Sequence, residues 1–143
     1  MKKLFLVVLI ILAGVAVISA SSLCFAQNKE GGTVIVYYFH GAFRCYTCNM
    51  MEKYAQEAIE TYFRDDILAG KIAFVPINVE EKNNEHFVQD YQLYTKALIL
   101  SLVEDGKEIK SRNLQKIWQY ARDKQQFSEY VVLEIESFRE GAR

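Results

Sequence analysis

Cys45 and Cys48 are separated by two residues, and they stand between an apolar run and a segment with helical periodicity. The run from Val34 to Phe39 is rich in β-branched and aromatic side chains, which is typical of a strand buried on both faces. Two thiols at this spacing can close into a disulfide and reopen. The N–H groups and the dipole of a helix N-terminus favour the thiolate, so the pair predicts a dithiol redox centre.

The two cysteines are expected to take different roles. Cys45 is expected at the helix N-terminus, where the positive charge of Arg44 would favour its thiolate as the attacking group. Cys48 falls one turn inside the helix on its apolar stripe, where burial would keep it protonated until it resolves the mixed disulfide. His40 is a candidate proton carrier because histidine exchanges protons near neutral pH, and the alternative is a histidine exposed in a loop.

Other side chains near the pair allow a second chemistry. Thiolates from Cys45 and Cys48 with Met50 and His40 could bind copper(I), and the two thiolates alone could bind arsenite or zinc. Methionine is also a common packing residue, and Met51 lies on the apolar stripe of the expected helix. The redox hypothesis needs no cofactor beyond the disulfide, so a metal belongs only to this alternative.

Aromatic side chains crowd the motif. Phe43 and Tyr46 lie beside or within it, and they could form an apolar platform for a docking protein or an aromatic substrate. Packing within the loop would explain the same residues. Trp118, at helical spacing with Leu114 and Ile117, is expected in the core.

The N-terminus has the features of a targeting segment. Lys2 and Lys3 precede an apolar run from Leu4 to Ala20, and small residues follow as far as Ala26. The pattern predicts a signal peptide over residues 1–26. The alternative is an uncleaved membrane anchor, because the apolar stretch approaches the roughly 20 residues needed to span a bilayer.

Either fate of this segment places residues 27–143 outside the cytoplasm. With the positive end inside, the remainder would lie in the periplasm or on the extracytoplasmic face of a bacterial membrane. Cys24 belongs to the leader, so cleavage would leave only Cys45 and Cys48. Disulfides are chemically permitted in that compartment.

Length and charge narrow the function classes. Residues 27–143 suffice for one domain with a real core. The two leader lysines belong to the 17 basic residues of the chain, whereas all 18 acidic residues follow the leader. This balance favours neither nucleic acid nor an anionic membrane surface as a partner.

The expected elements alternate between strands and helices. After the first strand and the helix carrying the pair, a second strand is predicted over Ile72–Val79 and a helix over Glu85–Tyr94. A third strand is predicted over Ala97–Val103, followed by a turn at Glu104–Lys107 and a short strand near Ile109. The segment Asn113–Arg139 has helical periodicity, with a break expected across Arg122–Gln126.

This order, with the C-x-x-C motif at the start of the first helix, resembles the thioredoxin fold. The strand that ends in Ile77, Asn78 and Val79 before acidic residues supports the resemblance. The fold class implied is α/β, with a central mixed β-sheet flanked by helices, an extended C-terminal helical segment and the N-terminal signal or anchor helix.

A narrower resemblance joins three segments, Tyr37–Cys48, Asn49–Tyr54 and Tyr91–Leu102, to thioredoxin-like proteins of the ArsF type. Those are identified as the subunit of a nitrophenyl compound nitroreductase that acts on nitroaryl arsenicals. The resemblance implies electron delivery from a membrane-side donor to a partner reductase, by a monomer or a subunit of a hetero-complex.

The chain departs from ordinary thioredoxins in three respects, one of which is the presence of Tyr46 and Thr47 between the cysteines and of Arg44 before them. The usual cis-proline would fall near Leu98, but the only proline is Pro76, so a trans loop is expected around residues 95–99. The resemblance still places Thr95 and Leu98 with Phe43 and Tyr46 on the partner platform. The buried acid of thioredoxins would fall near Phe39, which leaves His40 as its substitute.

The sequence thus predicts an exported thiol–disulfide oxidoreductase, with catalytic candidates Cys45, Cys48, His40 and Arg44. Three other functions stay open: a copper(I) or arsenite carrier, a disulfide-forming oxidase, and a non-enzymatic interaction domain with a vestigial motif. The residues between the cysteines and the neighbouring charge tune the reduction potential, so the direction of electron flow is left open.

Overall fold

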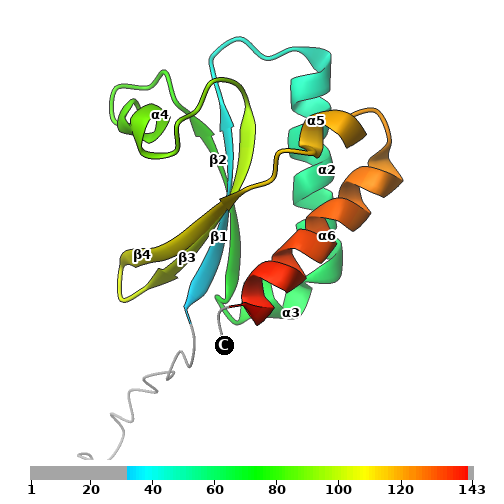
Figure 1. Cartoon of the computed structure of the whole chain (residues 1–143). Helices are drawn as coiled ribbons and strands as arrows, with labels where there is room; N and C mark the ends of the chain where they lie inside the picture. Colours follow the sequence, from blue (N-terminus) through cyan, green and yellow to red (C-terminus); the bar gives the residue numbers. More distant parts are fainter. Residues whose placement is uncertain (1–31, 142–143) are drawn as a thin grey trace, which may run out of the picture. The chain divides into compact units, whose positions relative to one another are not determined.

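The computed structural model describes residues 32–141, and a four-stranded mixed sheet lies at their centre (Figure 1). The strands are β1 (Thr33–His40), β2 (Ile72–Asn78), β3 (Ala97–Glu104) and β4 (Lys107–Asn113). Their order across the sheet is β2-β1-β3-β4. β1 pairs with β2 in parallel and with β3 antiparallel, and β3 pairs antiparallel with β4.

The sheet has helices on both faces. They are α2 (Tyr46–Tyr62), α3 (Arg64–Leu68), α4 (His86–Asp90), α5 (Ile117–Tyr120) and α6 (Lys124–Glu140). Figure 1 shows α2, α3, α5 and α6 on one face, whereas short α4 lies on the other. This mixed sheet with its flanking helices, and with α2 beginning directly after the first cysteine, is the predicted thioredoxin-like α/β arrangement.

The predicted signal peptide or anchor, residues 1–26, lies outside the described residues, and so does the boundary before residue 27. Both stay predictions. Within residues 32–141 no helix combines the length and the apolar character needed to cross a bilayer.

The alternating side chains of β1 enter two separate cores. Val34, Val36 and Tyr38 face the long helices and belong to the larger core. Phe39 faces the other way and packs with Ala97 and other side chains of β3 and α4. Side chains on this second face are mostly half-buried, because α4 covers only part of it. The prediction of a strand buried on both faces was therefore only partly right.

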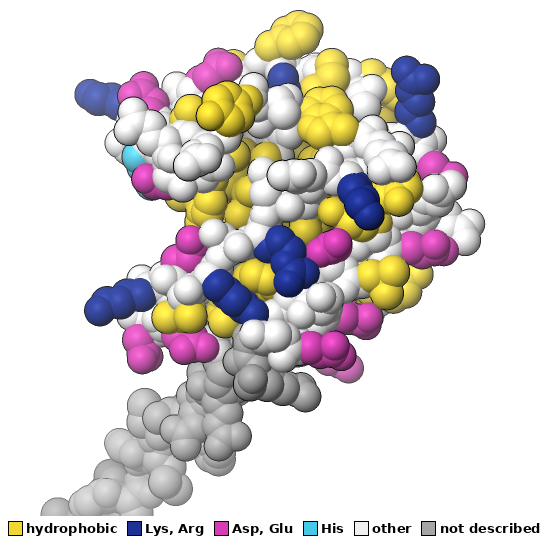
Figure 2. Space-filling model, viewed as in Figure 1, with side chains coloured by type: hydrophobic (Ala, Val, Ile, Leu, Met, Phe, Trp, Pro, Cys, Tyr) yellow, Lys and Arg dark blue, Asp and Glu magenta, His cyan; other side chains and the backbone are white. Residues whose placement is uncertain are grey.

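The second face is visibly less covered than the first. Figure 2 shows it hollowed between α4 and the β3–β4 hairpin, with hydrophobic side chains inside the hollow. The predicted helix over Glu85–Tyr94 is shorter in the structure, where α4 ends at Asp90 and Tyr91 is its C-cap. The φ angle of the next residue, Gln92, is 51°, a backbone conformation that cannot continue a right-handed helix.

Helix α2 follows its predicted pattern almost throughout. Its buried stripe contains Cys48, Met51, Ala55, Ala58 and Ile59, as expected from the period. The same period continues to Tyr62, but its side chain is exposed at the last residue of the helix. Phe63, just beyond the helix, is buried in its place.

The C-terminal segment is helical as predicted, but its break lies earlier. Residues 124–126 form the first turn of α6 because the carboxylate of Asp123 caps it, accepting the N–H of Gln126 at 3.0 Å. Asn113 belongs to β4. Both boundaries were set by local partners that periodicity alone does not show.

Trp118 was expected in the core and is instead 43% exposed. Its indole N–H donates to the carbonyl oxygen of Lys96 at 3.2 Å, while Leu114 and Ile117 are buried beside it. Helix α5 has only one turn, and Ile117 is its buried residue.

The connections agree with the predicted turn chemistry. The β3–β4 hairpin turns at Asp105 and Gly106, whose φ angles are 48° and 76°, as a two-residue hairpin turn with positive φ at both positions requires. Residues 32–141 contain no cis peptide bond, so the loop before β3 is trans as expected. Pro76 lies in β2, an edge strand, where its missing N–H interrupts an exposed edge.

Candidate functional site

Cys45 and Cys48 form a disulfide at the start of α2, with their Cα atoms 5.1 Å apart. Cys45 is the N-cap of the helix and is half-buried, whereas Cys48 is buried within the first turn. The more accessible sulfur is therefore that of Cys45. Cys48 is buried as predicted, whereas the roles of attacking and resolving cysteine stay predictions.

The sulfur of Cys45 occupies the position of a helix-capping acceptor. The backbone N–H of Cys48 donates to Cys45 Sγ at 3.2 Å, and the N–H of Asn49 donates to the Cys45 carbonyl oxygen at 3.1 Å. The first turn of α2 contains no acidic residue. After reduction, a thiolate at Cys45 would face an unopposed helix N-terminus, which favours the anion.

Arg44 does not present a free charge to this sulfur. Its guanidinium forms an ion pair with the carboxylate of Glu52, two turns into α2, and both side chains are partly buried. The prediction placed Arg44 beside Cys45 without a partner. Glu52 offsets part of the positive charge that the neighbouring thiolate would feel.

Tyr38 is a site residue that sequence reasoning missed. Its hydroxyl donates to the carbonyl oxygen of Cys48 at 2.8 Å, and its side chain is fully buried. Burial raises the pKa of Tyr38 to about 12, and the positive charge of Arg44 opposes this rise only in part. Period-two alternation from Val34 and Val36 places Tyr38 on the helix side, and that signal was available in the sequence.

The same alternation separates Tyr38 from Phe39, the position near which the resemblance would place the thioredoxin acid. Phe39 lies on the opposite face, in the smaller core. The residue of β1 that lies against α2 is Tyr38, one position earlier.

His40, the last residue of β1, is half-buried and does not reach the pair. Its Nδ1 lies 2.9 Å from the carbonyl oxygen of Gly41, and its ring centroid is 6.2 Å from that of Tyr38. Among the described residues, its ring makes no hydrogen bond to either cysteine. The structure therefore gives His40 no direct contact through which to move a proton at the disulfide.

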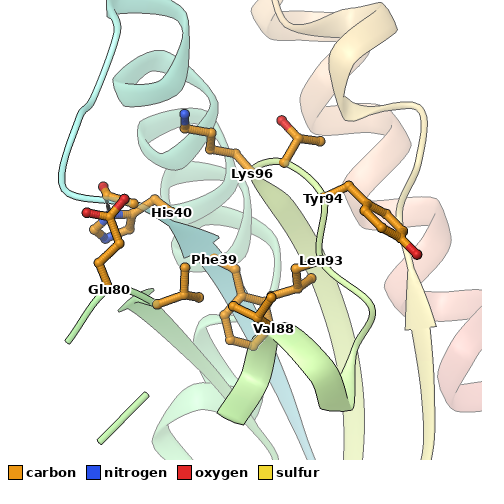
Figure 3. Close-up of a pocket in the computed structure, with 10 residues that line it drawn as sticks. Phe39, His40, Glu80, Val88, Leu93, Tyr94 and Lys96 are labelled. Carbon is orange, nitrogen blue, oxygen red and sulfur yellow. Dashed lines mark hydrogen bonds between the residues drawn. The ribbon is translucent and has the colours of Figure 1, made fainter. Parts of the chain in front are cut away.

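A pocket of about 170 Å³ opens beside His40 (Figure 3). Phe39, Val88 and Leu93 supply apolar lining, while His40, Glu80 and Lys96 supply ionisable groups. Glu80 approaches Gly41 so closely that a Cβ at Gly41 would collide with its carboxylate. The pocket thus combines an apolar lining with charges of both signs near the carboxyl end of β1.

The predicted platform is only partly assembled. Phe43 and Tyr46 are each 80% exposed, and Thr95 is exposed at the mouth of the pocket. Figure 2 shows hydrophobic side chains gathered at this end of the molecule. Leu98 is 0% exposed in the larger core, so its assignment to the platform was wrong. Tyr94 is an exposed aromatic side chain in the same region that the sequence analysis did not select.

The methionines near the cysteine pair, considered as candidate copper(I) ligands, differ in how deeply they are buried. Met50 is half-buried on α2, whereas Met51 is fully buried in the core, as its packing interpretation expected. Residues 32–141 contain no group of three or more His, Cys, Asp or Glu side chains placed to hold a metal ion. A copper(I) or arsenite site would therefore depend on thiols released by reduction, with Met50 or His40 as added ligands.

No family model and no curated protein matches this chain. Among solved structures it is similar to oxidized mitochondrial thioredoxin 3 from Saccharomyces cerevisiae, with 20% identity over 57% of this chain and 66% of that one, at a TM-score of 0.39. It is also similar to Fasciola hepatica thioredoxin, with 20% identity over 59% and 71% of the two chains, at a TM-score of 0.37. The fold assignment rests on the strand order and the position of the cysteines.

Proposed function

We propose that this protein is a thiol–disulfide oxidoreductase that passes electrons to a partner protein through Cys45 and Cys48. One observation carries the proposal: the two cysteines form a disulfide at the N-terminus of α2, with the first half-exposed and the second buried. A bridge over two intervening residues closes too small a loop to stabilise the fold much. Its position suits reversible chemistry instead.

In the reduced protein, the Cys45 thiolate attacks one sulfur of a partner disulfide. A bond forms between Cys45 Sγ and that sulfur, and the other partner sulfur leaves as a thiolate that takes up a proton. The helix N-terminus stabilises the attacking anion through the Cys48 N–H. The product is a mixed disulfide between Cys45 and the partner.

Cys48 then resolves the mixed disulfide. Its thiol gives a proton to solvent and attacks Cys45 Sγ, the intermolecular bond breaks, and the second partner thiolate leaves. Two electrons have passed to the partner, and the Cys45–Cys48 disulfide has formed. A membrane-side dithiol donor would restore the reduced state by the reverse exchange.

The ion pair of Arg44 and Glu52 favours the reducing direction over a disulfide-forming oxidase. A strong oxidant owes its high potential to a stabilised thiolate in the reduced form. Here Glu52 offsets the one cationic side chain adjacent to Cys45 in sequence. The thiolate is then stabilised mainly by the helix end.

The proposal extends to compartment and partner through the sequence. The leader over residues 1–26 supports export, and the resemblance to ArsF-type proteins supports a partner reductase such as a nitroaryl (arsenical) nitroreductase. Phe43, Tyr46 and Tyr94 offer exposed aromatic surface for docking such a partner.

The test is a redox titration of the purified mature chain against glutathione. The fraction of reduced protein is measured by mass spectrometry after the free thiols have been labelled. We expect reversible exchange of two thiols at a potential nearer that of thioredoxin, about −270 mV, than that of a strong oxidase, about −120 mV. Cys45→Ser should abolish exchange. Cys48→Ser should instead accumulate a mixed disulfide through Cys45.

Other outcomes would redirect the assignment. A potential near −120 mV would identify a disulfide-forming oxidase. A reduced protein that holds copper(I) or arsenite against a modest chelator, with binding weakened by Met50→Leu, would favour the carrier. Unchanged activity in Cys45→Ser would contradict the proposal directly.

A further inference from the structure

The Tyr38 hydroxyl reaches the redox motif from the sheet side of α2. It donates to the Cys48 carbonyl oxygen at 2.8 Å, while the N–H of the same residue donates to Cys45 Sγ at 3.2 Å. The backbone of Cys48 therefore connects a buried phenol to the attacking sulfur. Among residues 32–141, this is the side-chain hydrogen bond that joins the sheet to the first turn of α2.

We infer that Tyr38 is a positioning residue for thiol–disulfide exchange, whose hydroxyl holds the Cys48 backbone so that its N–H keeps facing Cys45 when the disulfide opens. The inference rests on the proposed function of the cysteine pair. In the oxidised state, the covalent bond already restrains the two residues. In the dithiol that restraint is gone, and the Tyr38 hydrogen bond remains.

Tyr38 acts through geometry, because it touches the Cys48 carbonyl and not a sulfur. Its phenol has one proton to donate, and that proton is used in this bond. The pKa of Tyr38, raised by burial to about 12, keeps the hydroxyl a donor over the range near 8.5 where thiols titrate. The restraint is therefore present whether Cys45 is a thiol or a thiolate.

The sheet fixes where this hydroxyl lies. β1 is a central strand, and Tyr38 pairs in register with Pro76 on one side and Leu98 on the other. Its ring belongs to the larger core together with Leu98 and Met51. A donor anchored in this way moves less than one carried by a loop, so it can hold the first turn of α2 in register with the sheet.

Loss of the Tyr38 hydroxyl should destabilise the reduced protein relative to the disulfide. With a less restrained Cys48 N–H, the Cys45 thiolate is stabilised less. The reduced form then loses stability relative to the disulfide, so the protein becomes a stronger reductant.

The experiment compares Tyr38→Phe with Tyr91→Phe, which removes a hydroxyl bonded to Glu108 on the other face of the sheet. Alkylation of Cys45 in the reduced protein is measured against pH, and the equilibrium with glutathione is measured separately. For Tyr38→Phe we expect the alkylation midpoint to rise by up to about one pH unit, and the equilibrium to move about threefold to tenfold toward the protein disulfide. Tyr91→Phe should have the same alkylation midpoint and the same glutathione equilibrium as the wild type.

A stability control separates positioning from general loosening. Leu98→Ala weakens the same core without removing the hydroxyl. Tyr38→Phe values equal to wild type, or a shift no larger than that of Leu98→Ala, would overturn the inference. If the wild type fails to exchange with glutathione, the proposed function fails, but the alkylation midpoints still test Tyr38 on their own.

Discussion

Arg44 and Glu52 form an ion pair beside the redox disulfide, so the cation that precedes Cys45 in sequence is not free to act on it alone. Glu52 follows Cys45 by seven residues, two helical turns, and therefore lies on the same side of α2. The charge that tunes the site is the balance of this pair.

Glu52→Gln should make the Cys45 thiolate more favourable, because it removes the anion that offsets Arg44. The alkylation midpoint of Cys45 should fall by about half a pH unit at low salt, and less at high salt where the charge is screened. Glu60→Gln is the control, since Glu60 lies at the far end of the same helix and bonds to Gln56. A midpoint that moves equally in both variants would contradict the role of the pair.

Leu98→Ala should destabilise the fold, because its side chain is fully buried in the larger core. A cavity of this kind costs about 2 to 5 kcal/mol of unfolding free energy. Chemical denaturation would measure it, with the exposed Leu133→Ala as the matched control. If Leu98→Ala unfolded like the wild type and lost only partner binding, the platform role would be restored.

The unfolding free energy should fall as the pH rises from about 10 to about 12, through ionisation of Tyr38. Burial raises the pKa of this phenol to about 12 in the folded protein, from 10.0. The unfolded chain therefore releases the proton first, and the stability present below pH 10 is lost on the way up. This difference in the pKa of Tyr38 between the folded and the unfolded chain corresponds to a loss of unfolding free energy on the order of 2 to 3 kcal/mol.

Denaturation of the wild type and of Tyr38→Phe at several alkaline pH values would check this. The variant should lose less stability over the same interval, while the partly buried phenol of Tyr91, whose pKa is also raised, still contributes in both proteins. Identical slopes in the two proteins would exclude Tyr38 as the source.

Asp66→Asn should weaken the attachment of α6 to the rest of the fold. Both carboxylate oxygens of Asp66 accept from the guanidinium of Arg139, at 2.8 and 3.0 Å, across 73 residues of sequence. Because the pair is partly exposed, we expect a loss of roughly 1 kcal/mol or less in unfolding free energy. Asp65→Asn, at the exposed neighbouring position, should have a smaller effect in the same denaturation assay.

Trp118 fluorescence should report a partly accessible indole, because this single tryptophan is 43% exposed. Acrylamide should quench the folded protein clearly, though less than the urea-unfolded chain. Quenching close to that of a fully buried indole would restore the original core assignment.

Features of this protein that depend on neighbours along the chain could be predicted from the amino-acid sequence. The spacing of Cys45 and Cys48 before a helical period predicted the disulfide at a helix start, and alternating elements predicted the mixed sheet with its flanking helices. The hairpin at Asp105 and Gly106 followed from turn chemistry. The disulfide and the hairpin depend on residues close together in sequence, whereas the mixed sheet was implied by the order of the elements and its resemblance to the thioredoxin fold.

The tertiary structure alone decided which distant groups meet at the site. Tyr38 bonds to Cys48, and Leu98 turned out to be core, because strand pairing and helix packing set which side of β1 and β3 faces α2. A one-residue change of position reverses the face on which a strand side chain lies, so Tyr38 contacts the Cys48 backbone while Phe39 packs on the opposite face. Likewise, the partner of Arg44 depended on how the loop before α2 folds back on the helix.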